Sequence, residues 1–504
     1  METENLSEAR RTQSRETQTD YRPQGQVPRL CQANLFTLLS LWMERFPRET
    51  PEDHDPMVRP CGLVVVRGGR VRGLHVSGPL LHAGQEAVLR HGGAGLEGSQ
   101  LYFSRRPCSA CLKMVVNAGV IQVFFWPGDP EVSVLSGRSA DRPPAPGPGV
   151  GPSPEALLDL KAVERLQAGG GPPVVVALRP LAPGLPQYVD LKSRTSDFME
   201  RVQEDQPEQD RDELFVRQRK SHLQELSRAF LIPCEREHRA VLELLGLEAF
   251  CQDPDLSTLR SSMLQLVELL ASVSAGLPLL HHGFYCAGED ASPRGPAPPP
   301  VSQAVACHCI IQATLLAFRT EDPKVGVGAV IWAQAELDGG DGTGLLYLVG
   351  CGYNAYPVGS QYAQYPQLDT KHPDRGRTKY RYIIHAEQNA LTFRSREVCP
   401  GQRLLLFVTK CPCDQCVPLI RAAGVTHVFT SDQDAGKDKG DISYLRFRGP
   451  IGPSRLTWQK RPLLSPSLTM NNATHLVERE REIGKRGRRD SQGRRPRQRC
   501  KGHS

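Results

Sequence analysis

One histidine and two cysteines in the C-terminal half of the chain have the types and spacing of a metal site. His385 opens the run His385-Ala386-Glu387. Cys413 lies 28 positions after that histidine, and Cys416 follows three positions later. In the first turn of a helix, residues at i and i+3 lie on one side, and the free backbone N–H groups there favour thiolates. One imidazole and two thiolates leave the fourth position of a tetrahedral zinc ion open, as in catalytic zinc sites. The spacing predicts Zn²⁺ bound by His385, Cys413 and Cys416.

Glu387 stands two residues from the histidine and is free to move protons. Zinc held by three protein ligands lowers the pKa of its water toward about 7, so that hydroxide is available at neutral pH. A carboxylate beside it can carry protons between that water and a reacting group. The alternative is a closed structural site with Cys411 as an extra ligand. Glu387 argues against that alternative, because a purely structural site needs no such acid.

The N-terminal half contains a second set of the same ligand types without the acid. Residues 82–84 read His-Ala-Gly. Cys108 lies 26 positions after His82, and Cys111 follows three positions later. The three ligands predict a second zinc ion, bound by His82, Cys108 and Cys111. Gly84 stands where the carboxylate is expected, so this second zinc is predicted to be non-catalytic.

Four stretches of the C-terminal half make the resemblance to a known family specific. They are 319–329 (RTEDPKVGVGA), 352–359 (GYNAYPVG), 379–391 (KYRYIIHAEQNAL) and 409–416 (TKCPCDQC). His-x-Glu followed by Pro-Cys-x-x-Cys is the signature of the zinc nucleobase deaminases, and these stretches resemble deoxycytidylate deaminases. With its tandem layout, the chain is similar to the cytidine and deoxycytidylate (dCMP) deaminase domain-containing proteins of the cytidine deaminase-like superfamily. The match is tight over 301–450 and looser over 30–135.

The resemblance implies a reaction and roles for individual residues. Glu387 would protonate N3 of cytosine, the activated water would attack C4, and Glu387 would carry a proton to the amine, which leaves as ammonia. Asn354 would contact the sugar and the base edge, and Ala386 is placed among the substrate contacts. A turn residue in a Gly-Tyr-Asn loop is the alternative for Asn354. The expected activity is hydrolysis of cytosine to uracil in free dCMP or dCTP, or in cytidine or deoxycytidine, within pyrimidine nucleotide metabolism.

A basic stretch before the metal-ligating histidine is a candidate for binding the substrate's phosphate. The candidate cations are Arg375, Arg377, Lys379 and Arg381, together with Arg319 earlier in the chain. Phosphate favours fixed donors of this kind. A solvated basic loop is the alternative, so Arg319 and Lys379 are predicted substrate contacts that depend on where the fold places them.

The role of the first metal set is open to two interpretations. Glu86, two residues beyond Gly84, lies about 200° around a helix from it, so we expect its carboxylate to point away from a bound base. A cysteine pair with a distant histidine in a neutral segment is typical of structural zinc. Because the metal pocket survives without its acid, a second hypothesis is that this unit packs against the catalytic one and binds a regulatory nucleotide.

The elements that must position these residues are repeated in the two halves of the chain. In both halves the order is helix, strand pair, helix, strand, helix, strand, which implies an α/β fold with helices on both faces of a sheet. The first copy is expected at 35–46 (with Asn34 as N-cap), 62–66, 71–76, from His82, 101–104, from Cys108 and 120–126. The second copy is expected at 301–318, 326–332, 346–352, from His385, 404–409, from Cys413 and 425–430. The resemblance implies two three-layer α/β/α domains, each a mixed central sheet flanked by helices.

Composition predicts the boundaries of these domains. The expected parts are a disordered 1–29, an inactive deaminase-like domain at 30–183 with a flexible Pro/Gly-rich insertion at 137–154, a helical linker at 184–300, a catalytic domain at 301–460 and a disordered basic tail at 461–504. The clearest helix of the linker is expected at 256–275, after an Asp-Pro-Asp start signal.

Charge separates two of the competing functions. The chain of 504 residues has a formal net charge of +7, but ten Lys and Arg against two acids fall within 481–504, so the remaining residues sum to −1. A polynucleotide-editing deaminase would need a basic, aromatic-lined groove to follow a strand. A near-neutral body with 6% aromatic residues gives little sign of one. A non-enzymatic zinc scaffold is the third class, and Glu387 makes it a poor description of the C-terminal half.

The remaining signals concern location and partners. The tail 485–501 (KRGRRDSQGRRPRQRCK) has two basic clusters, which predict a nuclear localisation signal read by an import receptor, a nucleic-acid patch or a solubilising tail. We expect a cytoplasmic and nuclear protein and, from the resemblance, a homo-oligomer. Apolar runs well short of the ~18–20 residues that span a bilayer, and a polar start, argue against a membrane or secreted protein. Fifteen cysteines, an odd number, argue against a disulfide framework.

Overall fold

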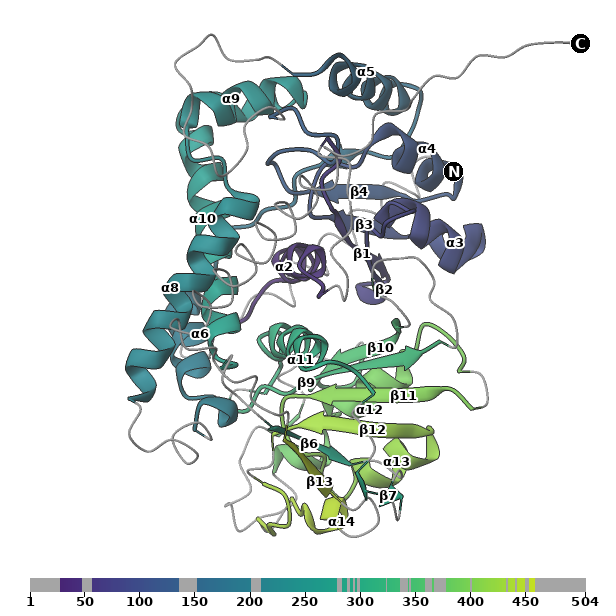
Figure 1. Ribbon diagram of the computed structural model, residues 1–504, viewed down its shortest axis with the longest axis vertical. Helices are drawn as coiled ribbons and strands as arrows, with labels where there is room; N and C mark the ends of the chain where they lie inside the picture. The colour runs from purple at the N-terminus through teal and green to yellow at the C-terminus, as the bar shows by residue number, and fades with distance from the viewer. Residues whose placement is uncertain are drawn as a thin grey trace, which may run out of the picture. The chain divides into compact units, whose positions relative to one another are not determined.

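The computed structural model describes seventeen segments of the chain, and most of their helices and strands are labelled in Figure 1. The described residues are 28–47, 57–135, 152–200, 210–278, 283–287, 291–292, 295–296, 300–322, 324–335, 343, 346–358, 365–366, 378–398, 401–431, 434–439, 442–448 and 453–457. The predicted basic tail, most of the Pro/Gly-rich insertion, and Arg375 and Arg377 lie outside them. None of the helices described is long and apolar enough to cross a bilayer.

The first α/β unit is built on a mixed sheet of five strands. In order across the sheet they are β2 (Arg70–Val76), β1 (Gly62–Arg67), β3 (Gln100–Phe103), β4 (Gln122–Phe125) and β5 (Val174–Val175). Strand β1 is antiparallel to β2 and β3, whereas β3, β4 and β5 run parallel. The helices are α2 (Gln32–Glu44), α3 (Ala83–Leu96), α4 (Ser109–Asn117) and α5 (Pro154–Ala168).

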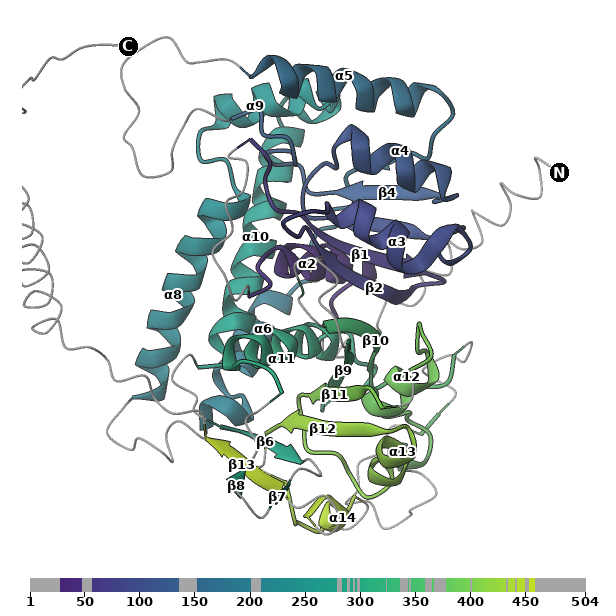
Figure 2. The ribbon, with the colours of Figure 1, turned by 45° about the vertical axis from the view of Figure 1, so that its right-hand side comes forward.

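Helices cover both faces of this first sheet. Leu63 and Val65 of β1 face a core that includes Ala87 of α3 and Leu112 of α4. Side chains of alternate strand residues point to the opposite face, where α2 packs on β1 and β3. Figure 2 shows α2 on one side of the sheet and α3 on the other. The predicted three-layer arrangement is therefore confirmed for the first unit.

The second α/β unit repeats this plan on a sheet of six strands. In order they are β10 (Leu346–Tyr353), β9 (Gly328–Gln334), β11 (Arg403–Val408), β12 (Val425–Thr430), β6 (Gly283–Ala287) and β13 (Pro453–Thr457). Strand β9 is antiparallel to β10 and β11, and β11 is parallel to β12. Its helices are α11 (Gln303–Ala317), α12 (Ala386–Thr392), α13 (Cys416–Ala422) and α14 (Leu445–Arg448), with a 3₁₀ turn at Lys379–Arg381.

The second sheet is likewise covered on both faces. Ile331 of β9 and Leu406 of β11 share a core with Ala390 of α12 and Ile420 of α13. On the opposite face α11 packs on β9. The α/β class and the mixed sheets flanked by helices are thus confirmed for both halves.

The segment between the two units is mainly helical, with one exception. Its helices are α6 (Leu185–Arg194), α8 (Arg211–Phe230), α9 (Glu235–Leu244) and α10 (Asp255–Ala275), with a 3₁₀ turn at Glu248–Phe250. The helix expected at 256–275 is confirmed. The exception is β6, which lies inside the predicted linker but pairs antiparallel with β12 of the second sheet. A short pair, β7 (Ala291–Ser292) and β8 (Gly295–Pro296), follows it.

One predicted helix cap is wrong. Helix α2 begins at Gln32 with Cys31 as its N-cap, and Asn34 lies inside the helix. The Asn34 amide instead pairs with the backbone of Arg179, donating to its carbonyl at 2.8 Å and accepting from its N–H at 3.0 Å. The residue is buried, so a contact with a segment 145 positions away took precedence over local capping.

One strand in each sheet begins with a glycine that a helix crosses closely: Gly62 in β1 and Gly328 in β9. We therefore expect a side chain at either position to destabilise the fold. A Cβ on Gly328 would lie 1.8 Å from the carbonyl oxygen of Ala313 in α11. We expect Gly328→Ala to lower the free energy of unfolding by ~3 kcal/mol, because the helix must shift to admit the methyl group. Chemical denaturation measures the effect. Gly93, whose Cβ would meet nothing within 4 Å, is the matched control, and an equal loss in Gly93→Ala would contradict the packing argument.

Candidate active site

Three predicted metal ligands of the second unit converge at the starts of α12 and α13. The Nδ1 atom of His385 lies 3.3 Å from the sulfur of Cys413 and 3.3 Å from that of Cys416. Both thiols are buried. Zinc bound by nitrogen at ~2.0–2.1 Å and by sulfur at ~2.3 Å needs donor atoms at about this separation. The three side chains therefore fit a single tetrahedral zinc ion.

Local structure explains how His385 and the cysteines reach one another. His385 is the extended residue before α12, and its backbone N–H donates to the Gln388 side chain at 2.9 Å, which fixes the start of the helix. Helix α13 begins at Cys416 rather than at Cys413, because a turn separates the cysteines. The Cys416 N–H still donates to the Cys413 carbonyl at 2.9 Å, so both sulfurs lie on the same side.

Cys411 does not complete this set of ligands. Among the described residues, the acidic, histidine and cysteine side chains with donor atoms within 4.8 Å of one another at this point are His385, Cys413 and Cys416. The Cys411 thiol instead lies 3.8 Å from the Pro412 carbonyl oxygen. The described part of the second unit therefore offers three ligands, the arrangement that leaves a coordination position open.

The two thiols of this site differ in acidity. The Cys416 thiol hydrogen-bonds to the Cys413 sulfur, which together with His385 lowers the pKa of Cys413 to about 4. The same interaction raises the pKa of Cys416, and burial adds to that effect. Metal ligation requires both thiols to be deprotonated, so a divalent cation would take the place of the shared proton.

Glu387 lies beside the metal ligands and is buried, with 4% of its surface exposed. Burial raises the pKa of the Glu387 carboxyl to about 7, and the Cys413 sulfur adds to this rise while His385 opposes it. A carboxyl group with such a pKa can both accept and donate a proton near neutral pH. The residue predicted as the proton carrier thus has the environment that this role needs.

A cavity of about 190 Å³ is lined by two of the predicted metal ligands, His385 and Cys413, and by Glu387. Its walls also include Asn354, Ala386, Lys410, Lys439 and Tyr444. Two of the predicted substrate contacts, Asn354 and Ala386, therefore border the same cavity as His385 and Cys413. Ala386 is fully buried at the first turn of α12.

Asn354 is held mainly by the loop that it borders. Its side-chain oxygen accepts from the Thr320 hydroxyl at 2.7 Å and from the Val327 N–H at 2.8 Å, and its amide donates to the Val325 carbonyl at 2.8 Å. These bonds occupy the oxygen and one of the two amide hydrogens. The structure thus gives Asn354 the turn-bracing role that the sequence left as the alternative.

The two predicted phosphate contacts are not among the residues that line the cavity. Lys379 is fully buried and forms an ion pair with Asp322, with 2.8 Å between Nζ and Oδ1. Arg319 is 2% exposed, and its guanidinium donates to the Leu30 carbonyl at 3.1 Å. Neither side chain lines the cavity, because each is committed to a buried partner.

Two lysines that sequence reasoning missed border the cavity instead. Lys410 pairs with Asp197 at 3.2 Å, and Lys439 pairs with Asp434. Their side chains are 30% and 49% exposed. Lys410 lies within the stretch TKCPCDQC, so its closeness in sequence to the metal ligands could have identified it as a substrate contact. Lys439 lies in a loop without a motif and could not have been identified in this way.

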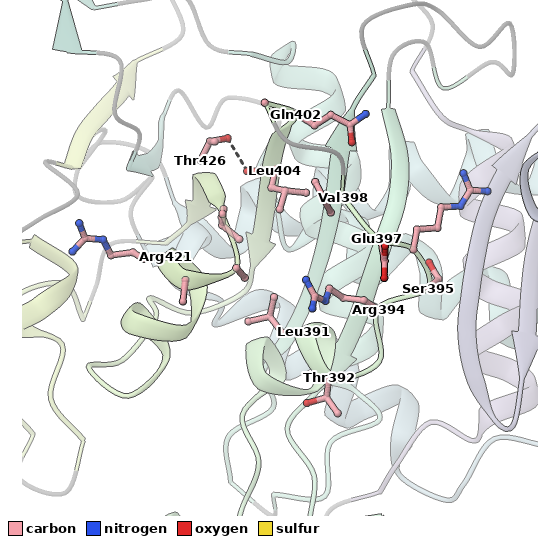
Figure 3. Close-up of a pocket in the computed structure, with 16 residues that line it drawn as sticks. Leu391, Thr392, Arg394, Ser395, Glu397, Val398, Gln402, Leu404, Arg421 and Thr426 are labelled. Atoms are coloured by element: carbon pink, nitrogen blue, oxygen red, sulfur yellow. Dashed lines mark hydrogen bonds between the residues drawn. The ribbon is translucent and has the colours of Figure 1, made fainter.

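A wider cavity of about 1270 Å³ lies beside α12 and α13 and is shown in Figure 3. Arg394, Glu397 and Arg421 line it, and the Thr426 hydroxyl donates to the Leu404 carbonyl at 2.9 Å within it. None of its lining residues is a candidate metal ligand, and Glu387 is not among them. The chemistry predicted from the sequence therefore belongs to the smaller cavity.

The first unit also brings its three predicted ligands together. His82 precedes α3 as His385 precedes α12, and its Nδ1 atom lies 3.3 Å from the Cys108 sulfur. Cys111 belongs to the same group, within 4.8 Å. A fourth residue, Glu131, joins this group and was not predicted. Glu86 is buried and pairs with Arg90, outside the described ligand group, as the helix geometry predicted.

Comparisons with known proteins cover the stretch of chain that contains this site. A family model described as the cytidine and deoxycytidylate deaminase zinc-binding region matches residues 306–431. A zebrafish (Danio rerio) protein named cytidine and dCMP deaminase domain-containing protein 1 is 50% identical over 451 residues, which cover 88% of this chain and 92% of that protein. The human (Homo sapiens) deoxycytidylate deaminase is 32% identical over 136 residues, covering 27% of this chain and 69% of the enzyme.

A solved structure, the apo dCMP deaminase of cyanophage S-TIM5, is also similar to part of this chain. It is 23% identical, with a TM-score of 0.18, over 25% of this chain and 80% of that one.

Proposed function

This chain belongs to the family of cytidine and dCMP deaminase domain-containing proteins, and from that premise we propose that its second α/β unit is a zinc-dependent hydrolytic deaminase of free cytosine nucleotides. One observation carries the proposal: His385 lies 3.3 Å from two buried thiols, and the buried carboxyl group of Glu387 borders the same cavity. Zinc held there would supply an activated water at neutral pH. The reaction replaces the amine at C4 of cytosine with oxygen and releases ammonia.

Proton transfers in this reaction are assigned to Glu387. As a carboxylate it takes a proton from the attacking water, and as an acid it gives that proton to N3 of the base. It then takes the remaining proton of that water, now a hydroxyl on C4, and gives it to the exocyclic amine, so that the C4–N bond breaks, ammonia leaves and the C4 carbonyl forms. Its raised pKa supports both roles. Because the carboxyl group is buried, these transfers occur away from bulk water.

Phosphate recognition is assigned to Lys410 and Lys439, in place of Arg319 and Lys379. Both lysines border the cavity and are partly exposed. Ion pairs at a surface contribute little stability, so the partly exposed Asp197 can give up Lys410 to a phosphate at small cost, whereas Asp434 is buried and holds Lys439 more firmly. The buried pair of Lys379 with Asp322 is far harder to break, because it would leave an uncompensated charge in the interior.

This assignment makes a kinetic prediction. We expect Lys439→Ala to raise the KM for a deoxycytidine nucleotide about tenfold, the effect of losing one charge-assisted hydrogen bond. The KM for deoxycytidine should not change, because the nucleoside has no phosphate. Lys437, which is exposed on the same loop but does not line the cavity, is the control. Equal increases in the KM of nucleotide and nucleoside would remove Lys439 from phosphate binding.

A direct assay tests the proposed substrate class. The purified chain with zinc is offered cytidine, dCMP, dCTP and single-stranded DNA, and the uracil product is quantified for each. We expect turnover of at least one free nucleotide. Turnover confined to single-stranded DNA would overturn this proposal in favour of the polynucleotide-editing alternative.

The basic tail is proposed, from the sequence alone, to bind a nuclear import receptor. We expect a fluorescently tagged chain lacking residues 481–504 to lose its nuclear concentration, because ten of its basic residues are removed. Fluorescence microscopy against the full-length tagged chain measures the change. Undiminished nuclear concentration would dispose of the import role. Homo-oligomerisation and a regulatory nucleotide at the first unit stay predictions of the resemblance and of the retained ligands, respectively.

A further inference from the structure

The backbone of the first unit fixes Glu131 next to the metal ligands. Glu131 lies in the loop after β4, and its N–H donates to the Arg106 carbonyl at 3.0 Å. Its own carbonyl accepts from the Arg59 N–H at 2.7 Å, and the next residue, Val132, forms a β-bridge with Val58. Three backbone interactions therefore set the position from which its side chain extends.

The Glu131 side chain is directed into the ligand group. The residue is 1% exposed, and one carboxylate oxygen accepts from the Cys108 N–H at 2.8 Å. The other oxygen lies 3.1 Å from Nδ1 of His82, the nitrogen that also faces the Cys108 sulfur at 3.3 Å. Tetrahedral zinc with bonds of ~2.0–2.2 Å to nitrogen and oxygen would place these two atoms about 3.3 Å apart. The observed separation suits two ligands of one ion.

Gly84 occupies the position at which the first unit lacks a proton-carrying acid, and the space around it admits no side chain. A Cβ on Gly84 would lie 2.8 Å from the Cβ of Cys111 and 3.0 Å from its sulfur. In the second unit the corresponding position holds Glu387, which borders the cavity. In the first unit a carboxylate thus approaches the ligands from the loop after β4 and not from the helix that follows the histidine.

The loop after the corresponding strand of the second unit is arranged differently. It contains Asp434, which pairs with Lys439 and borders the cavity. Asp434 is not part of the group formed by His385 and its two cysteines. Among the described residues, therefore, an acid from this loop joins the ligand group in the first unit but not in the second.

We propose that Glu131 is the fourth ligand of zinc in the first unit and closes that site to water. His82, Cys108, Cys111 and Glu131 then form a complete tetrahedral set, the form that structural zinc sites take. Zinc would join α3, α4 and the loop after β4 into one rigid assembly, and binding energy at such a site adds to folding stability. The proposal does not depend on the activity of the second unit.

Cobalt substitution of the full-length chain tests this proposal. Cobalt(II) reports its coordination through its visible absorption, and azide changes the spectrum only where it can occupy an open or water-filled position. We expect azide to change the spectrum of one of the two bound cobalt ions in the native chain. In Glu131→Ala, we expect azide to change the spectra of both ions. Two azide-responsive ions in the native chain, or still one in Glu131→Ala, would overturn the proposal.

Two further variants keep this experiment decisive. Glu131→Gln retains the size of the side chain and its acceptor for the Cys108 N–H, so it should fold even where alanine does not, and we expect two responsive ions. Glu86→Gln removes another buried acid of the first unit, which pairs with Arg90 outside the ligand group. It should behave as the native chain does. A carboxylate that only hydrogen-bonds His82 would leave the first cobalt responsive to azide in every variant.

Discussion

Replacing Glu387 by glutamine is expected to lower the kcat for cytosine deamination about a thousandfold, within the range by which general acid–base groups accelerate reactions. Glutamine has almost the same size and cannot carry a proton between water, N3 and the leaving amine. The zinc content should not change, because Glu387 lies outside the ligand group. Uracil formation and elemental analysis of the same preparation measure the two quantities.

A matched variant separates this effect from a general disturbance of buried acids. Glu86 is also buried and also lies in the first turn of the helix after a ligand histidine, but in the first unit. We expect Glu86→Gln to retain kcat. Native turnover in Glu387→Gln would remove that residue from the mechanism, and loss of zinc in it would show that the carboxyl group acts through the metal site.

Replacing Cys413 and Cys416 together by serine should abolish deamination and halve the zinc content of the chain. Serine hydroxyls are poor zinc ligands at neutral pH, because zinc requires a deprotonated donor. Without the ion no activated water is available, so the expected loss is at least as large as that of Glu387→Gln. Zinc analysis, product formation and the melting temperature of the double variant test this prediction.

This double variant shows whether deaminase activity depends on the zinc ion of the second unit. Measurable deamination after loss of the second-unit zinc would contradict the proposed mechanism. A fall in melting temperature alone, with zinc and activity kept, would show that the two thiols are only packed side chains. Their convergence on His385 at 3.3 Å makes the joint loss of zinc and deaminase activity the expected result.

Local patterns in the sequence predicted the elements and the ligand sets well. Alternating apolar residues and helix start signals involve neighbours in the chain, so they identify strands such as β1 and helices such as α10 without knowledge of the fold. The Cys-x-x-Cys spacing is similarly local, because one helical turn or one tight turn brings both sulfurs together. The repetition of the same order in both halves then predicted two similar sheets, and the structure confirms this for four strands of each, β2-β1-β3-β4 and β10-β9-β11-β12.

Contacts between distant parts of the chain were beyond these patterns. Lys379 was predicted to meet phosphate but pairs with Asp322, 57 positions away, and Arg319 reaches Leu30, 289 positions away. Glu131 lies 20 positions after Cys111 in a loop without a motif. Only the fold shows that this loop returns to the ligands. Strand β6 was missed for the same reason, since its pairing partner β12 lies far along the chain.

The metal content of a chain without the first-unit thiols tests the central claim most directly. In a variant with Cys108→Ser and Cys111→Ser, only His385, Cys413 and Cys416 remain as a predicted zinc set. Elemental analysis of the purified variant should find one zinc ion per chain, accompanied by deaminase activity. A folded variant that contains no zinc, or that forms uracil without it, would contradict the account.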